Sequence, residues 1–131
     1  MGFWLFMLAA VLLVPLVMLG FGTRFLRHPP KRINGVYGYR TTRSMKNQDT
    51  WTFAHRTCGR LWRKLGLILL LLSLAVMLPL AGRPEGLVGL WGIVLEGVQL
   101  AVLIGSLFPV EAALKRTFDD SGLRKKPAPR E

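Results

Sequence analysis

The sequence has few acidic residues and almost no cysteine. Seven Asp and Glu side chains stand against eighteen Lys and Arg among 131 residues, which gives a formal net charge of +11. Cys58 is the single cysteine, so an internal disulfide is excluded. Beside Arg56 and Arg60, this thiol is expected to be a small packing group.

The sequence also lacks the motifs that usually carry catalysis. It has no glycine-rich phosphate loop, no nucleophile elbow and no H-E-x-x-H zinc motif. His28, His55 and Cys58 match no zinc-ligand spacing. We therefore expect no enzymatic activity, no catalytic residue, no metal and no cofactor.

What the chain has instead is long apolar runs. Hydrophobic residues make up 51% of the sequence and charged residues 19%. A membrane-spanning helix needs about 20 apolar residues to cross a hydrocarbon core of roughly 30 Å. Spans are predicted at about 3–22, 65–81 and 87–108, so the fold class is an all-α integral membrane protein with three transmembrane helices. Such runs argue against nucleic acid as the partner of the basic residues.

The first run carries two further signals. No Lys or Arg precedes Arg24, so the basic start of a cleaved signal peptide is missing and the run is expected to be retained as a span. Pro15 lies in its middle and has no backbone N–H, which removes one helical hydrogen bond and predicts a kink.

The distribution of Lys and Arg predicts the orientation. Residues 23–64 hold eleven, the stretch after Pro109 holds six, the turn at 82–86 holds one, and the residues before Arg24 hold none. Basic segments are retained in the cytoplasm. The N-terminus is therefore predicted outside and the C-terminus inside.

The segment 23–64 is predicted to contain a motif loop followed by an amphipathic helix. From Asn47 onward, apolar residues recur every three or four positions through Trp51, Cys58 and Leu65. Ser44 or Asn47 is the expected N-cap, and the helix is expected to lie along the cytoplasmic interface before span two. The membrane domain is predicted to cover 1–114, and 115–131 is predicted to be a basic, disordered cytoplasmic tail.

Two groups of polar residues are candidates for function. In the loop 34–47, cations alternate with neutral donors, a set that suits phosphate or carboxylate, although an ordinary positively charged cytoplasmic loop would look similar. In the third run, Gly89, Gly92, Glu96 and Gln99 share one helix face that should meet protein. Glu96 is either a hydrogen-bonded packing group with Gln99 or a ligand-binding or proton-carrying residue.

The loop resembles a known signature. Its residues Pro30, Asn34, Gly38-Tyr39-Arg40-Thr41, Ser44, Asn47, Trp51, Ala54 and Gly59 resemble those of the SdpI/YfhL-like family of small bacterial membrane proteins. His55 departs from the asparagine expected after the alanine. The candidate ligand-binding or functional residues of the loop are Asn34, Gly38, Tyr39, Arg40, Thr41, Ser44, Asn47, Trp51 and His55.

The resemblance implies a multi-pass protein of the bacterial cytoplasmic membrane that gives immunity to a membrane-active peptide toxin. In some members it also implies signalling, through a cytoplasmic repressor held at the membrane. The partners expected are a hydrophobic toxin peptide, such a repressor, anionic lipid headgroups at the cytoplasmic face and a further copy of the chain. Two alternatives stay open: a small oligomeric proton-coupled transporter that uses Glu96, and an adaptor that binds anionic lipid.

Overall fold

The structure is a computed structural model of the chain, and it describes residues 1–125. These residues form helices α1 (Gly2–Arg27), α2 (Gln48–Met77), α3 (Glu85–Gly105) and α4 (Leu107–Thr117), with a 3-10 turn η1 at Leu78–Leu80. In this part of the chain, three helical stretches are long and apolar enough to cross a membrane: α1, α2 with η1, and α3 with α4. The prediction of an all-α chain with three membrane-length helices is confirmed.

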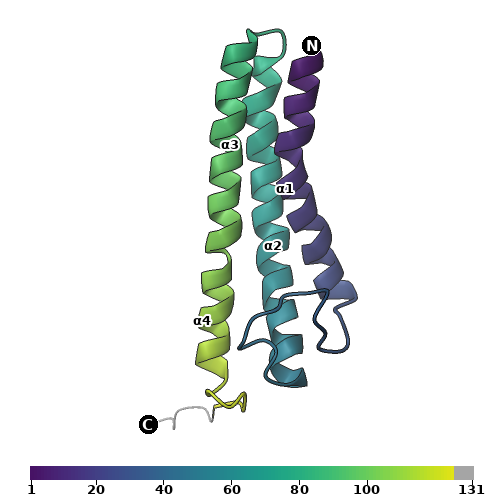
Figure 1. Ribbon diagram of the computed structural model, residues 1–131, viewed down its shortest axis with the longest axis vertical. Helices are drawn as coiled ribbons and strands as arrows, with labels where there is room; N and C mark the ends of the chain where they lie inside the picture. The colour runs from purple at the N-terminus through teal and green to yellow at the C-terminus, as the bar shows by residue number, and fades with distance from the viewer. Residues whose placement is uncertain (126–131) are drawn as a thin grey trace.

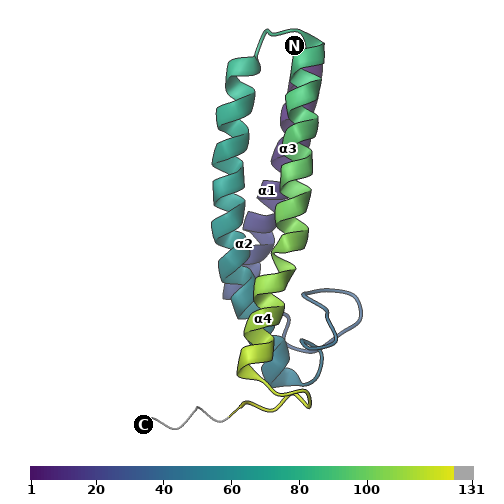
Figure 2. The ribbon, with the colours of Figure 1, turned by 90° about the vertical axis from the view of Figure 1, so that its left-hand side faces the viewer.

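The helices form three columns that run side by side (Figure 1). α3 and α4 stack end to end in one column, and α1 and α2 form the other two. The N-terminus lies at the same end as the turn between α2 and α3, whereas loop 28–47 and the last described residues lie at the opposite end (Figure 1; Figure 2). We call this opposite end, where the basic segments gather, the loop end.

Helix α2 is continuous and contains no separate interfacial helix. It begins directly after Asn47, whose side chain accepts a hydrogen bond from Thr50 N while the Thr50 side chain accepts one from Asn47 N. Of the two predicted N-caps, Ser44 and Asn47, this reciprocal capping box confirms Asn47. The expected interfacial helix instead forms the first turns of α2, because residues 48–77 contain no proline that would break the helix.

The third column extends beyond its predicted end. The predicted span ends at 108 because Pro109 follows, but Pro109 lies in the first turn of α4. A proline there removes no helical hydrogen bond, since the first N–H groups of a helix have no partner within it. The break lies instead at Ser106, whose hydroxyl accepts from Trp62 Nε1 at 2.9 Å and donates to Leu103 O at 2.6 Å.

Glycines bring α1 and α2 into backbone contact. A Cβ built on Gly66 would lie 2.8 Å from Leu19 N and 3.0 Å from Pro15 O. One built on Gly22 would lie 2.7 Å from Arg63 N. Small residues allow this close approach, which van der Waals packing rewards in a membrane.

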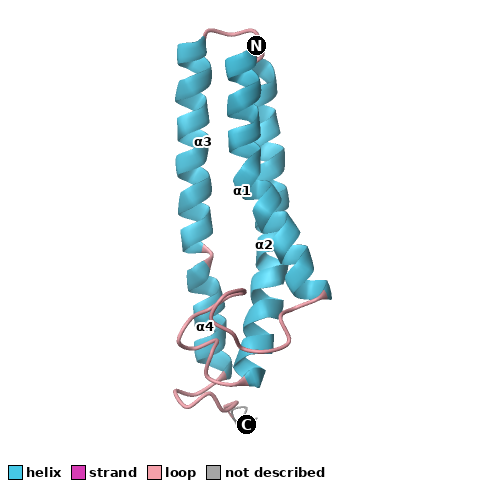
Figure 3. Cartoon of the chain, turned by 45° about the vertical axis from the view of Figure 1, so that its right-hand side comes forward, coloured by secondary structure: helices cyan, strands magenta, loops and turns pink. Residues whose placement is uncertain are grey.

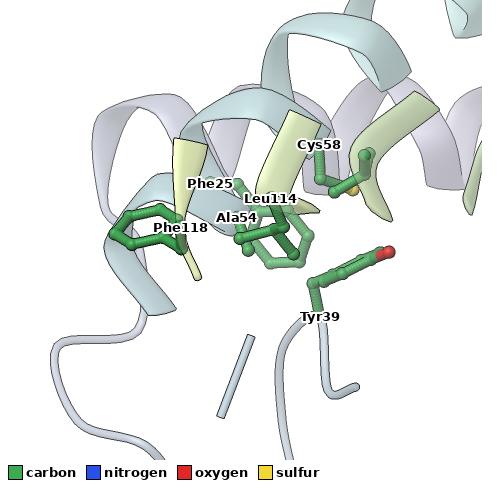
Figure 4. Packing of buried hydrophobic residues seen from close by; sticks show 7 residues of the cluster. Phe25, Tyr39, Ala54, Cys58, Leu114 and Phe118 are labelled. Atoms are coloured by element: carbon green, nitrogen blue, oxygen red, sulfur yellow. The ribbon is translucent and has the colours of Figure 1, made fainter. Parts of the chain in front are cut away.

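Two apolar clusters hold the columns together. One lies toward the N-terminal end and contains Val11, Met77, Leu80, Val88 and Leu95. The other lies at the loop end and contains Phe25, Tyr39, Ala54, Cys58, Val110, Leu114 and Phe118. In Figure 4 the Tyr39 ring, which comes from the loop, lies beside side chains of the helices. The loop therefore contributes to the core of the loop end.

The segment after α4 is ordered as far as it is described. The predicted disordered tail began at 115, but residues 115–117 complete α4, and Phe118 pairs with Arg124 in a short bridge. Arg124 binds the Asp49 carboxylate with two nitrogens, each at 2.8 Å. The prediction missed these contacts because their partners lie at the distant start of α2. Residues 126–131 of the predicted tail lie outside the described residues.

Candidate functional site

Loop 28–47 returns along the loop end and lies beside α2 and α4 (Figure 3). Its first turn is organised by Asn34, whose Oδ1 accepts from Val36 N at 2.9 Å and from Tyr37 N at 2.7 Å. The Arg40 guanidinium donates to Gly35 O and closes this turn. Asn34 and Arg40 therefore shape the loop backbone.

Gly38 lets the loop approach α2. Its φ of +115° is one that side-chain-bearing residues rarely adopt. A Cβ built at this position would lie 2.5 Å from His55 Nε2. The predicted importance of this glycine therefore has a direct steric reason.

Tyr39 joins the loop to two helices. Its backbone N–H donates to His55 Nε2 of α2 at 2.9 Å, and its hydroxyl donates to Glu111 Oε1 of α4 at 2.8 Å. The side chain is 6% exposed. Burial, and then the neighbouring Glu111 carboxylate, raise the pKa of the Tyr39 phenol above its ordinary value. The phenol therefore remains protonated and continues to donate.

His55 is held as one neutral tautomer. Because its Nε2 accepts from the Tyr39 N–H, the ring proton lies on Nδ1, which is 2.8 Å from Trp51 O. The ring packs against Trp51, with 4.3 Å between ring centroids, and against the edge of Phe25 at 4.9 Å. This residue precedes the apolar run that starts at 65, and burial lowers its pKa. His55 thus acts as a buried hydrogen-bonding group.

Trp51 anchors the start of the loop. It is fully buried, and its Nε1 donates to Pro30 O at 2.8 Å. Trp51 also packs on His55, which accepts a hydrogen bond from Tyr39 in the middle of the loop. The Trp51 side chain therefore links the beginning of the loop to its middle.

The remaining hydroxyl and amide groups of the loop are used internally. Thr41 N donates to Ser44 Oγ at 2.8 Å, and Ser44 N donates to Thr41 Oγ1 at 3.1 Å. The Ser44 hydroxyl lies 3.0 Å from Tyr39 O, and Asn47 Nδ2 donates to Gly122 O at 2.6 Å. These neutral donors, which were predicted to bind an anion, hold the loop and the last described segment together.

The cations of the loop face outward. Arg40 and Lys46 are exposed, and Arg43 lies 3.7 Å from the Asp120 carboxylate. Arg43 and Lys46 border an open hollow of about 240 Å³ that Thr42 and Asp120 complete. In residues 1–125, no group of three or more His, Cys, Asp or Glu is placed to hold a metal ion.

The intramembrane candidates have different surroundings. Gln99 is fully buried, and its Nε2 donates to Val11 O at 2.7 Å and to Ser73 Oγ at 2.8 Å. Pro15 has no N–H to give the Val11 carbonyl, so Gln99 supplies the missing donor. Glu96 is half-buried, and its carboxylate makes no hydrogen bond or ion pair to the rest of residues 1–125. The hydrogen bond between Glu96 and Gln99, which one of the two interpretations of Glu96 expected, is absent from this part of the chain.

Comparison of the sequence with known proteins identifies a family. The model of the SdpI/YfhL protein family matches residues 31–110. The chain belongs to this family. The "Uncharacterized protein YfhL" of Bacillus subtilis (strain 168) is 51% identical over 41 residues, which are 31% of this chain and 37% of that relative. The match thus covers little more than a third of the relative's length. No solved structure matches the chain.

The SdpI/YfhL match includes most of loop 28–47, all of α2 and α3, and the start of α4. The predicted resemblance is confirmed. Sequence reasoning missed two polar partners, Ser73 and Glu111. Glu111 is 72 positions from Tyr39, and no local pattern pairs residues at that distance. For Ser73 a signal existed, since Pro15 frees a carbonyl that needs a donor, but the sequence did not identify which helix supplies it.

Proposed function

We propose that this SdpI/YfhL family member is an immunity-type protein that protects a bacterium against a membrane-active peptide toxin. Membership of the family supports the class of function. In the proposed arrangement the loop end faces the cytoplasm, in agreement with the excess of Lys and Arg there. The toxin peptide binds at the bundle, and loop 28–47 forms the cytoplasmic part of the working site.

The exposure of Arg40 is the observation that carries this proposal. Among the signature residues, all of which lie in the described chain, the side chains of Tyr39, Ser44 and Trp51 are buried. Arg40 is the exposed member of the set. A residue that is exposed while its neighbours fix its position suits contact with a partner, because a preorganised cation loses little entropy on binding.

A survival assay tests this role. A toxin-sensitive bacterium that expresses the protein is challenged with membrane-active peptides, and Arg40→Ala is compared with wild type at equal membrane abundance. We expect wild type to protect and Arg40→Ala to lose most of the protection. Arg32→Ala is the matched control, since Arg32 is also an exposed loop cation. The hydrogen bond at Arg32 is made by its backbone carbonyl, which accepts from Asn34 Nδ2, so the substitution leaves it in place. Full protection by Arg40→Ala, or equal loss in both variants, would count against a specific role of Arg40.

Glu96 supports a second candidate, proton-coupled transport by an oligomer. Its half-buried carboxylate has no partner within residues 1–125, and ionisable groups inside a membrane commonly belong to ion or substrate pathways. Transport predicts that Glu96→Gln abolishes protection while Arg40→Ala preserves part of it. Full protection by Glu96→Gln across the pH range would remove this candidate.

A further inference from the structure

A groove on α1 runs from the membrane-spanning part of the helix to loop 28–47. It consists of two adjoining open hollows of about 390 and 240 Å³, which share Val17 and Phe21. The first hollow continues along Leu16 and Gly20, and the second is walled by the loop and by Trp62 of α2. The groove therefore starts on an exposed apolar face of α1, and Arg24 is the charged residue among those that line it.

The floor of the groove is open because of Gly20. A Cβ built there would meet no atom within 4 Å. By contrast, Gly22 and Gly66 are needed for contact between α1 and α2. Gly20 makes no such contact, so it leaves space on the outer face of the helix without serving the fold.

Arg24 lies at the loop end of the first hollow. Its Nε donates to the Tyr37 hydroxyl at 3.1 Å, and its guanidinium carbon lies 6.0 Å from the centre of the Tyr37 ring. Within residues 1–125, Arg24 makes no ion pair with an acidic side chain. The structure thus holds an exposed positive charge in place, two residues after the predicted end of the first span at 22.

We infer that this groove is a binding site for an anionic phospholipid. One acyl chain lies along Leu16, Val17, Gly20 and Phe21, and the phosphate contacts the guanidinium of Arg24 at headgroup depth. Arginine suits this role because its planar fork gives two donors to a phosphate. A net negative headgroup is favoured because the neighbouring Arg27 is exposed and likewise makes no ion pair in the described chain. The inference does not depend on toxin protection.

Native mass spectrometry of the full chain, released from detergent with equal amounts of phosphatidylglycerol and phosphatidylethanolamine, tests the site. We expect wild type to retain phosphatidylglycerol preferentially. Gly20→Leu, which fills the groove, and Arg24→Gln, which removes the charge, should each reduce retention by about tenfold, equivalent to about 1.4 kcal/mol. Arg24→Lys should keep part of the preference.

Two variants serve as matched controls. Gly97→Leu adds the same side chain at an exposed glycine of α3 where nothing lies within 4 Å, and Arg60→Gln removes an exposed charge from α2. Both should retain phosphatidylglycerol like wild type, and all variants should keep the helical circular dichroism of wild type. Equal retention of the two lipids by wild type would overturn the inference. Unchanged retention by folded Gly20→Leu, or equal loss in Gly97→Leu, would overturn it as well.

Discussion

At the scale of single residues, the signature acts largely through buried hydrogen bonds. Tyr39 donates from its backbone to His55 and from its hydroxyl to Glu111, so one residue connects the loop to α2 and α4. A buried polar group that loses its partner costs about 1–3 kcal/mol. Substitutions that leave the partners of Tyr39 unpaired should therefore loosen the loop end first.

His55 should make stability depend on pH. Burial lowers its pKa in the folded chain below the unfolded value of about 6.5, so the unfolded state binds a proton more readily. Stability should be constant above this pH and fall as the pH drops from about 6.5 toward the folded pKa. Two neighbours do not titrate in this window, because burial raises the pKa of Cys58 to about 12 and that of Tyr39 above its ordinary range.

Denaturant unfolding in detergent micelles between about pH 8 and pH 5 checks this expectation. His55→Gln should remove most of the acid-dependent loss, since its amide oxygen reaches as far as Nε2 and can accept from Tyr39 N without titrating. His28→Asn is the control, because it replaces an exposed histidine. This variant should show the same pH profile as wild type. A wild-type stability that rises on acidification would contradict the buried neutral state of His55.

At the scale of helices, a backbone hydrogen bond that is missing in α1 is replaced by one from a side chain of α3. Pro15 cannot donate to Val11 O, and Gln99 of α3 does so while also reaching Ser73 of α2. This contact links three helices within the apolar part of the bundle. The contact explains why the third span contains the polar residue Gln99. The pattern of residues on the helix face did not predict this role.

A double-mutant cycle tests this repair. Gln99→Leu should destabilise the wild-type bundle by about 1–2 kcal/mol, because the Val11 carbonyl loses its donor. In the Pro15→Ala background the cost should fall by about 1 kcal/mol, since the substituted alanine restores a backbone N–H four residues after Val11. Unfolding in mixed micelles measures both values. Equal costs in the two backgrounds would show that Gln99 and Pro15 are not coupled.

Much at the helix scale was predictable from the sequence. Local spacing predicts the three apolar runs, an N-cap at Ser44 or Asn47, and the inward face of Gln99. The structure has the runs, the cap at Asn47 and a buried Gln99. Boundaries at Pro109 and residue 115 were misplaced. A proline near the start of a helix looks the same in sequence as one that ends a helix, and the contacts of residues 118–125 are long-range.

At the scale of the whole molecule, loop 28–47 is a part of the bundle. Its Tyr39 ring enters the same apolar cluster as side chains of α1, α2 and α4. The sequence did not predict how the polar residues of this loop are used, because a row of cations and hydroxyls predicts anion binding just as well as internal capping. Thr41 and Ser44 pair locally, but the partners of Tyr39 N and of the Asn47 amide lie 16 and 75 positions away, and no local pattern identifies them.

Hydrogen exchange at the Tyr39 amide tests most directly whether the signature fixes the loop on the bundle. In wild type this amide should exchange much more slowly than that of exposed Thr42, and His55→Ala should speed it by about tenfold, as expected for loss of roughly 1.4 kcal/mol. His28→Ala should leave it unchanged. Exchange at Tyr39 as fast as at Thr42 in wild type would contradict a fixed loop.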